Sequence, residues 1–357
     1  MKPIYKITLL FLLIPLLTSA NIDKKKHEKN KVITKFFNVN TDAKLIITNK
    51  YGNLNITTWD KNRVEIEVTI TIQGDDLDDV NEKLSTIDVA FNSNSSLVEA
   101  RTIIDNQKSA WSWWGKSKKI NYKINYVVKM PRSNSVNLNN VYGDIYLDIL
   151  DGSAAINCNY GKVSIGNLSA VNNNINLEYC TTSNINYMKE GVVKSDYSKL
   201  NIGTSENIKI NAKYSTVKIE NAVNVAFNCD YGSMYIEEAE EIKGNSDYLS
   251  MQFGTVKKNL FIETDYGSLT VKNLVKGFQN VVVNAEYAGV NIGVDSDAVF
   301  EFEIDLQYAD FNRNENNIVF SKNISKSTDK YYEGKFGIGK SNSKLKVKSQ
   351  YGGVTIK

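Results

Sequence analysis

The sequence predicts an all-β protein, a parallel β-solenoid (β-helix) of about twelve short coils with an N-terminal cap of antiparallel strands and a helix. Two features indicate this fold. A tyrosine recurs twelve times, at spacings of 17 to 21 residues between Tyr142 and Tyr308. Runs of alternating apolar residues flank each copy, and repeats of about 20 residues are typical of solenoids, whose units bury their apolar faces by stacking. The recurring tyrosines are Tyr51, Tyr142, Tyr160, Tyr179, Tyr197, Tyr214, Tyr231, Tyr248, Tyr266, Tyr287, Tyr308 and Tyr351.

Each coil is predicted to hold two short strands with the tyrosine at the corner between them. The position four before the tyrosine is apolar in every copy except Gly244, and the position three after it is apolar in every copy except Thr182. Polar residues separate these positions, so each run has the period of two that marks a strand with one buried face. The residue after the tyrosine is small in every copy except Leu249, which suits a tight corner.

The same alternation predicts where the tyrosine rings lie. The position two before each tyrosine is usually small, as at Cys158, Ser195 and Cys229, and it shares parity with the buried face. Two small neighbours leave room for an inward ring. We therefore expect the rings to stack inside the corner rather than to form an exposed aromatic ladder for sugars.

The chain begins with a predicted signal peptide at residues 1–20. Lys2 and Lys6 precede the apolar run Ile7–Leu17, and small residues close the segment at Thr18–Ala20. No later stretch approaches the roughly 20 apolar residues that a membrane span requires, so we expect no transmembrane segment in the mature chain. The protein is predicted to be exported to the periplasm, the outer-membrane surface or the extracellular space.

The charge of the chain argues against nucleic acid as a partner. The full sequence has 43 basic and 40 acidic residues, for a net charge of +3. Removal of the signal peptide takes away two lysines and no acid, which leaves about +1. Residues 21–35 read as a flexible, Lys-rich leader that contains the only histidine, His27. A lone histidine offers neither a zinc site nor a Ser-His pair, and we expect no catalytic residue, metal ligand or cofactor.

Residues 36–135 are predicted to hold the first coil and a capping insertion. The insertion contains strands at Val64–Ile72, Ser96–Ile104 and Ile120–Met130 and a helix within Asp75–Val89. Capping covers a sheet edge that would otherwise invite aggregation. Residues 136–357 form the remaining coils, with an insertion at 313–343 that we expect to cover the end made by the last coil.

Three tryptophans stand close together between the last two strands of the capping insertion. They are Trp111, Trp113 and Trp114, and Lys116 follows them. If the segment is a loop, exposed aromatic side chains beside a lysine indicate a contact with a partner, a glycan or a membrane surface. The alternative is that they fold back onto the cap as a small satellite core.

Three other patterns have structural explanations. Gly334–Ser341 matches the phosphate-binding loop G-x-x-x-x-G-K-[ST], but a β coil rather than a helix follows it, so we expect a Gly-rich hairpin. Cys158, Cys180 and Cys229 are predicted to be small buried residues. The residue before each tyrosine forms an outward column, for which we prefer a solvated face to a calcium site. Charged members of this column include Glu178, Asp196, Lys213, Asp230, Asp247, Asp265 and Glu286.

The Tyr-Gly coils, most plainly Asn49–Asp60 and Ser349–Ile356, resemble the bacterial putative-adhesin family of exported β-solenoid proteins, similar in style to auto-transporter adhesin heads. The resemblance implies surface adhesion or envelope scaffolding and supplies no catalytic residues. We therefore expect a non-enzymatic protein of the cell envelope whose partner is a protein or a glycan. The alternatives are a periplasmic accessory of envelope-stress signalling and a polysaccharide-acting β-helix enzyme.

Overall fold

A computed structural model describes residues 25–105, 119–313 and 317–357. These residues form strands and one helix, α1 (Leu77–Ser85). The strands are β1 (His27–Asn38), β2 (Lys44–Lys50), β3 (Leu54–Trp59), β4 (Arg63–Gly74), β5 (Ile87–Asn94), β6 (Leu97–Ile104), β7 (Asn121–Pro131), β8 (Ser135–Val141), β9 (Ile145–Leu150), β10 (Ala154–Asn159), β11 (Val163–Leu168), β12 (Asn173–Glu178), β13 (Thr182–Asp196), β14 (Lys199–Leu274), β15 (Asn280–Val294), β16 (Phe300–Gln307), β17 (Phe311–Arg313), β18 (Ile318–Ser325), β19 (Asp329–Phe336), β20 (Lys344–Gln350) and β21 (Val354–Ile356).

The all-β class is confirmed, but the prediction of a parallel β-solenoid is wrong. The described strands join in a single 21-stranded sheet that mixes parallel and antiparallel pairs. Antiparallel pairs occur at both ends of the molecule: β1–β4, β4–β7 and β5–β6 at one, and β16–β19 and β18–β19 at the other. The repeat pattern indicates which side chains are buried. It does not indicate whether strands outside the repeat pair with the repeat strands in a parallel or an antiparallel direction.

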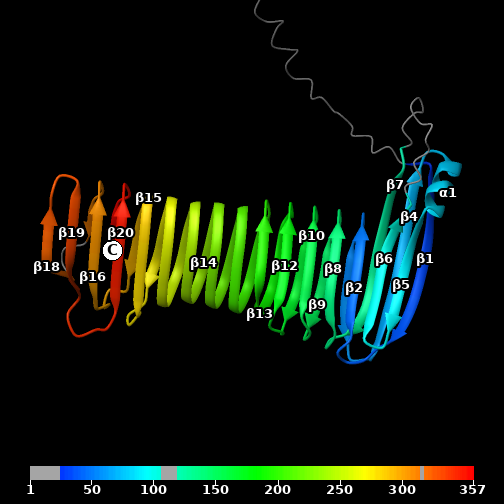
Figure 1. The fold of residues 1–357 in the computed structure, drawn as a ribbon, viewed down its shortest axis with the longest axis horizontal. Helices are drawn as coiled ribbons and strands as arrows, with labels where there is room; N and C mark the ends of the chain where they lie inside the picture. The colour runs from blue at the N-terminus through cyan, green and yellow to red at the C-terminus, as the bar shows by residue number, and fades with distance from the viewer. Residues whose placement is uncertain (1–24, 106–118, 314–316) are drawn as a thin grey trace, which may run out of the picture.

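Two series of strands run side by side along the long axis of the molecule (Figure 1). One series follows the order β5–β6–β2–β8–β10–β12–β13, and the other follows β1–β4–β7–β3–β9–β11–β13. Because β13 belongs to both and pairs with β14, which pairs with β15, the two series continue toward the C-terminal end. Within this region each tyrosine marks one repeat.

The core lies between the two series and is built from columns of in-register apolar side chains. In the column four before the tyrosine, Ile156 pairs with Leu138 on one side and with Ile175 on the other. All three are at most 1% exposed. Burial of a side chain of this size contributes about 1.5–3 kcal/mol, so every repeat is stabilised mainly by its two neighbours.

The antiparallel strands and helix expected at the N-terminal end are present. Helix α1 is shorter than the predicted segment because strand β5 already begins at Ile87. Asp76 caps the helix by accepting hydrogen bonds from the backbone N–H groups of Asp78 and Asp79, at 2.9 and 3.1 Å. The flexible leader predicted at residues 21–35 is wrong for residues 27–35, which belong to β1 and pair with β4. The predicted signal peptide lies outside the described residues.

The C-terminal end is not assembled in chain order. Strand β20 lies between β15 and β16 and is parallel to both, so the repeat of Tyr351 is inserted before that of Tyr308. Figure 1 shows the C-terminus within the row of strands rather than at its end. The insertion at 313–343 was expected to cover the last coil of the sequence. Its strand β19 pairs instead with β16, and β18 pairs with β19.

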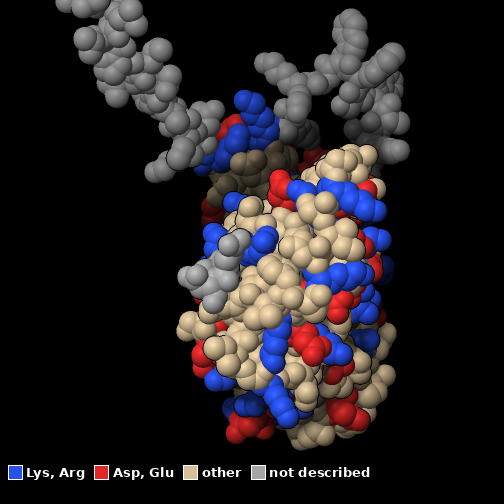
Figure 2. Space-filling model, turned by 90° about the vertical axis from the view of Figure 1, so that its left-hand side faces the viewer, with Lys and Arg blue, Asp and Glu red and all other residues tan. Residues whose placement is uncertain are grey.

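Strand β18 forms the outer edge at this end. Figure 2 looks onto that end, where lysines and acidic residues are intermixed around an uncharged centre. An unpaired strand edge is a template for aggregation, and charged residues such as Lys322 oppose it.

Candidate functional site

The recurring tyrosines form a continuous ladder of stacked rings. Neighbouring ring centroids are 4.6 to 5.3 Å apart and the ring planes differ by 2 to 18°. The stack follows the chain from Tyr51 to Tyr287 and then runs through Tyr351 to Tyr308. The centroid spacing equals the distance between neighbouring strands, so the in-register pairing of the repeats produces the stack.

The inward orientation predicted for the rings is wrong. From Tyr142 onward the ladder tyrosines are 42 to 55% exposed. The prediction assumed extended backbone through the corner, but every ladder tyrosine has a positive φ, between 50 and 63°. A left-handed residue interrupts the alternation of a strand, because successive side chains point to opposite faces only while the backbone stays extended. The exposed ladder is the feature that the sequence interpretation missed.

Each corner combines backbone strain with ring stacking. A non-glycine residue in the left-handed region costs about 1–2 kcal/mol. A stacked aromatic pair contributes about 0.5–1.5 kcal/mol, which is of the same size. The ladder therefore offsets the strain of its own corners while leaving one edge of every ring in solvent.

The arrangement determines what the ladder can offer to a partner. Ring faces inside the stack are covered by neighbouring rings, so the accessible parts are ring edges and phenol hydroxyls. At the N-terminal end Tyr122 meets Tyr51 edge-on, with centroids 5.0 Å apart. Partial burial, followed by the neighbouring tyrosines, raises the pKa of Tyr179, Tyr231 and Tyr287. These three hydroxyls therefore stay protonated at neutral pH. A phenol hydroxyl can both donate and accept hydrogen bonds.

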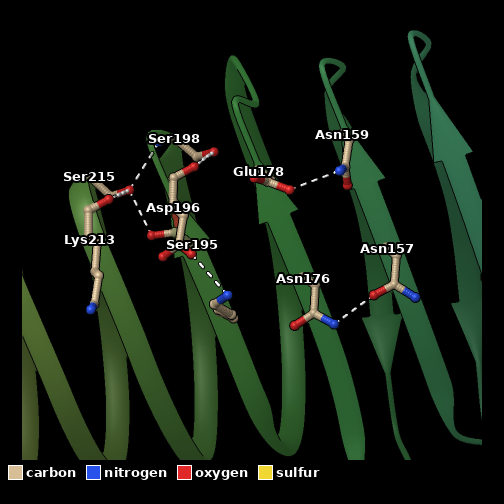
Figure 3. Close-up of polar contacts among 10 residues, drawn as sticks. Asn157, Asn159, Asn176, Glu178, Ser195, Asp196, Ser198, Lys213 and Ser215 are labelled. Carbon is tan, nitrogen blue, oxygen red and sulfur yellow. Dashed lines mark hydrogen bonds and ion pairs between the residues drawn. The ribbon is translucent and has the colours of Figure 1, made fainter.

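The charged column beside the ladder is partly engaged by protein groups. Asn159 donates from Nδ2 to Glu178 at 2.9 Å (Figure 3). Lys194 Nζ lies 3.0 Å from Asp196 Oδ2. Among the residues that the structure describes, no three His, Cys, Asp or Glu side chains come together as a metal-binding group. In the described part of the chain the carboxylates of this column are spread over successive repeats.

Polar side chains inside and beside the corner also form ladders along the stack. Asn176 donates from Nδ2 to Asn157 at 2.6 Å, and Asn157 donates to Asn139 at 2.7 Å. Figure 3 shows Asn176 and Asn157 at equivalent positions of successive repeats. Near the tyrosines, Ser215 accepts a hydrogen bond at Oγ from the backbone N–H of Ser198, at 3.0 Å. These contacts hold successive repeats in register.

The three cysteines are buried and free, as predicted. Cys180 belongs to a different column from Cys158 but lies next to it, since its Sγ donates to the carbonyl oxygen of Cys158 at 3.1 Å. The contact between the two thiols lowers the pKa of Cys180 and raises the pKa of Cys158, which burial raises further. Burial raises the pKa of Cys229 to about 12.

The glycine-rich segment Gly334–Ser341 lacks the surroundings of a phosphate-binding loop. Strand β19 ends at Phe336, residues 337–343 contain no helix, and β20 follows. Without a helix N-terminus the segment lacks the N–H groups that bind phosphate.

His27 is the first residue of β1. Trp111, Trp113 and Trp114, the predicted contact residues, lie outside the described residues.

Comparisons with known proteins give distant likenesses. No family model matches the chain, and no curated protein matches it. A solved structure described as a putative cell adhesion protein from Clostridium sporogenes is 12% identical, covers 92% of this chain and 99% of its own, and has a TM-score of 0.19. A putative adhesin from Bacteroides fragilis is 13% identical, with coverage of 92% and 97% and a TM-score of 0.24.

A third solved structure, described as a putative lipid binding protein from Parabacteroides distasonis, is 10% identical, with coverage of 91% and 96% and a TM-score of 0.26. TM-scores this low assign neither a fold nor a role to the present chain. Within the described residues, no helix has the length and apolarity needed to cross a membrane.

Proposed function

We propose that this protein is a non-enzymatic, exported component of the cell envelope that acts as an adhesin or interaction scaffold. The observation that carries the proposal is the exposed tyrosine ladder, which continues through all twelve repeats. The resemblance of the Tyr-Gly repeats to the bacterial putative-adhesin family supports the same role. The partner is a protein or a glycan of the envelope or surface.

The ladder is both rigid and rich in tyrosine, and both properties favour binding. Tyrosine is enriched in interfaces because it combines a large apolar ring with a polar hydroxyl and loses little rotamer entropy on binding. In the ladder that entropy is already lost, since each interior ring is held between two others 4.6 to 5.3 Å away. A preorganised surface gains affinity because less ordering is required when the complex forms.

The ladder also presents a repeated pattern rather than a single pocket. Hydroxyl groups recur at the spacing of the repeats, so a partner with its own extended or repetitive surface meets many equivalent contacts. Multiple weak contacts along one rigid axis add avidity without any strong individual site. This behaviour suits adhesion and scaffolding.

The first test compares three variants in a binding assay on isolated envelope material and whole cells. In the ladder variant, Tyr197, Tyr214, Tyr231 and Tyr248 are replaced by Asn, which tolerates positive φ. In the hydroxyl variant the same residues become Phe, which preserves stacking. The matched control replaces the outward residues four positions later in the same repeats, Asn201, Lys218, Tyr235 and Gln252, by Ser.

We expect the Asn variant to lose binding and the control to retain it, with circular dichroism verifying that each remains folded. Loss in the Phe variant would assign recognition to the hydroxyls. Equal binding by the folded Asn variant and the control would refute the ladder as the contact surface.

Two separate measurements test the cellular location of the protein and its lack of enzymatic activity. Protease digestion of intact cells, against lysed cells, with an antibody to the mature chain tests surface exposure against a periplasmic location. Incubation with a panel of pectins and alginates tests for polysaccharide turnover, and product formation would contradict a non-enzymatic role.

A further inference from the structure

A groove of about 840 Å³ lies on the outward side of strands β12 to β14, away from the tyrosines. Its floor is the column five residues before the tyrosine in six successive repeats. These residues are Asn174, Val192, Lys209, Ala226, Lys243 and Phe261. With neighbouring strands about 4.8 Å apart, the column extends roughly 24 Å along the stack. The site is therefore long and open, which favours a linear ligand.

One wall of the groove is rich in side-chain amides. This wall is formed by the residues seven positions before the tyrosine in five successive repeats. In order along the stack they are Asn172, Glu190, Asn207, Asn224 and Glu241. Asn224 donates from Nδ2 to Asn207 at 2.8 Å, which fixes both amides and leaves other donor and acceptor positions for a ligand. Fixed amides are suited to hydroxyl groups, which both donate and accept hydrogen bonds.

The charges and apolar surface of the groove further restrict the ligand. Glu190 and Glu241 are matched by Lys209 and Lys243, so the lining has no net charge and favours a neutral ligand over a polyanion or polycation. Phe261 is 39% exposed and closes one end, where it offers an apolar surface to a sugar ring.

The backbone beneath the groove argues against an extended peptide. A peptide strand binds by adding hydrogen bonds at a free sheet edge. Here Gly191 pairs with Asn173 on one side and with Ile208 on the other, so these strands are interior and their backbone groups are engaged. A ligand on this face is recognised by side chains alone.

We infer that this groove binds a linear, neutral glycan along the axis of the stack, at a site separate from the tyrosine ladder. The amide column provides hydrogen bonds to successive hydroxyls, and Phe261 packs against a terminal ring. The inference goes beyond the proposed adhesive role, because it assigns a ligand class to a surface that the ladder does not include.

The test measures binding by isothermal titration calorimetry to neutral oligosaccharides, namely β-linked glucose, xylose and N-acetylglucosamine oligomers, with oligogalacturonate and an extended uncharged peptide as comparisons. Ala226→Trp fills the centre of the groove from an outward position. Asn221→Trp places the same ring on an exposed position of that repeat outside the groove and is the control. Phe261→Ala removes the apolar end.

We expect the wild type and Asn221→Trp to bind a neutral oligomer equally, Ala226→Trp to lose binding, and Phe261→Ala to bind about tenfold more weakly. The Asn variant of the ladder should bind the glycan normally, which separates this inference from the proposed function. Failure of every neutral oligomer to bind, equal binding by Ala226→Trp, or preference for oligogalacturonate or the peptide would overturn the inference.

Discussion

The rings of Tyr287 and Tyr351 stack with centroids 4.6 Å apart and planes 2° apart, although a whole repeat and an insertion separate them in the chain. The contact exists because β20 lies between β15 and β16. Strand β20, close to the C-terminus in the sequence, thus lies one repeat from the end of the ladder.

This position makes β20 a sensitive place for substitution. Val347 is fully buried and pairs with Val283 and Ile304 in the flanking strands. We expect Val347→Asp to destabilise the protein by about 3 kcal/mol or more, because it buries an unpaired carboxylate. Val319→Asp, at a position 71% exposed in the edge strand β18, is expected to stay within about 0.5 kcal/mol. Urea denaturation of both variants checks the prediction, and similar midpoints would argue against the inserted position of β20.

The glycine that follows each of several ladder tyrosines allows close approach between repeats. A Cβ at Gly143 would lie 1.9 Å from the carbonyl oxygen of Gly52, whereas a Cβ at Gly289 would have no neighbour within 4 Å. We expect Gly143→Ala to cost about 2 kcal/mol or more and Gly289→Ala to be neutral within about 0.5 kcal/mol. Thermal melting of the pair measures the difference. Equal melting temperatures would contradict the close contact at the corner.

Substitutions at Tyr231 separate stacking from backbone strain. Tyr231 has φ 54° and stacks on Tyr214 and Tyr248 at 4.8 and 4.9 Å. We expect Phe to be nearly neutral, Asn to lose two stacking contacts of about 0.5–1.5 kcal/mol each, and Ala to lose about 1 kcal/mol more than Asn. The free energy of unfolding of the three variants gives the order. A ranking with Ala above Asn would show that the left-handed conformation is not costly here.

The buried phenol of Tyr126 should make the free energy of unfolding depend on pH in the alkaline range. Its side chain is fully buried, its hydroxyl lies 2.7 Å from Thr102 Oγ1, and burial raises its pKa to about 12. Because the folded pKa exceeds the unfolded value of 10.0, the folded state favours the protonated phenol. This contribution is fully present below pH 10 and is lost as the pH rises toward 12, with a total of about 3 kcal/mol.

Denaturant unfolding between pH 8 and 11.5 tests this expectation. The wild type should lose stability steeply above pH 10, and Tyr126→Phe should show a smaller slope even though it lacks the hydrogen bond to Thr102. A slope that is identical in both proteins would mean that the titration arises elsewhere, for example in the ladder.

The sequence predicted the repeats well because spacing and alternation report burial directly. The position four before the tyrosine is predicted to be buried in nearly every repeat, and its members Ile156, Ile175 and Val193 are buried and paired in register in the structure. Three strands of the capping insertion, β4, β6 and β7, were predicted within a few residues for the same reason, whereas β5 was not predicted. The overall sheet could not be predicted, since β18, β19 and the inserted β20 lie outside the regular spacing. In addition, parallel and antiparallel strands show the same alternation of apolar and polar residues, so the sequence does not indicate the direction of pairing.

The tyrosine ladder illustrates the limit of the parity argument. Cys158 faces the core as predicted, but the left-handed corner turns the Tyr160 ring outward. One signal was present in the sequence. A row of inward phenols would need a hydrogen-bonding partner for every hydroxyl, and the neighbouring core columns are apolar, so burial would have been costly. The sequence gave no comparable indication of the groove, because the residues that line it come from six repeats and are far apart in the chain.

The place of β20 between β15 and β16 has a consequence for biosynthesis. A chain that folds as it emerges from its N-terminus completes β16 before β20 exists, and at that stage the edge of β15 is open to the parallel strand that follows it. Pairing of β16 with β15 would bring Tyr308 beside Tyr287 and occupy the site of β20. Because β20 pairs with both β15 and β16, these two strands can form their final pairs only once the residues of β20 have been made, so this end of the sheet is completed after the preceding repeats.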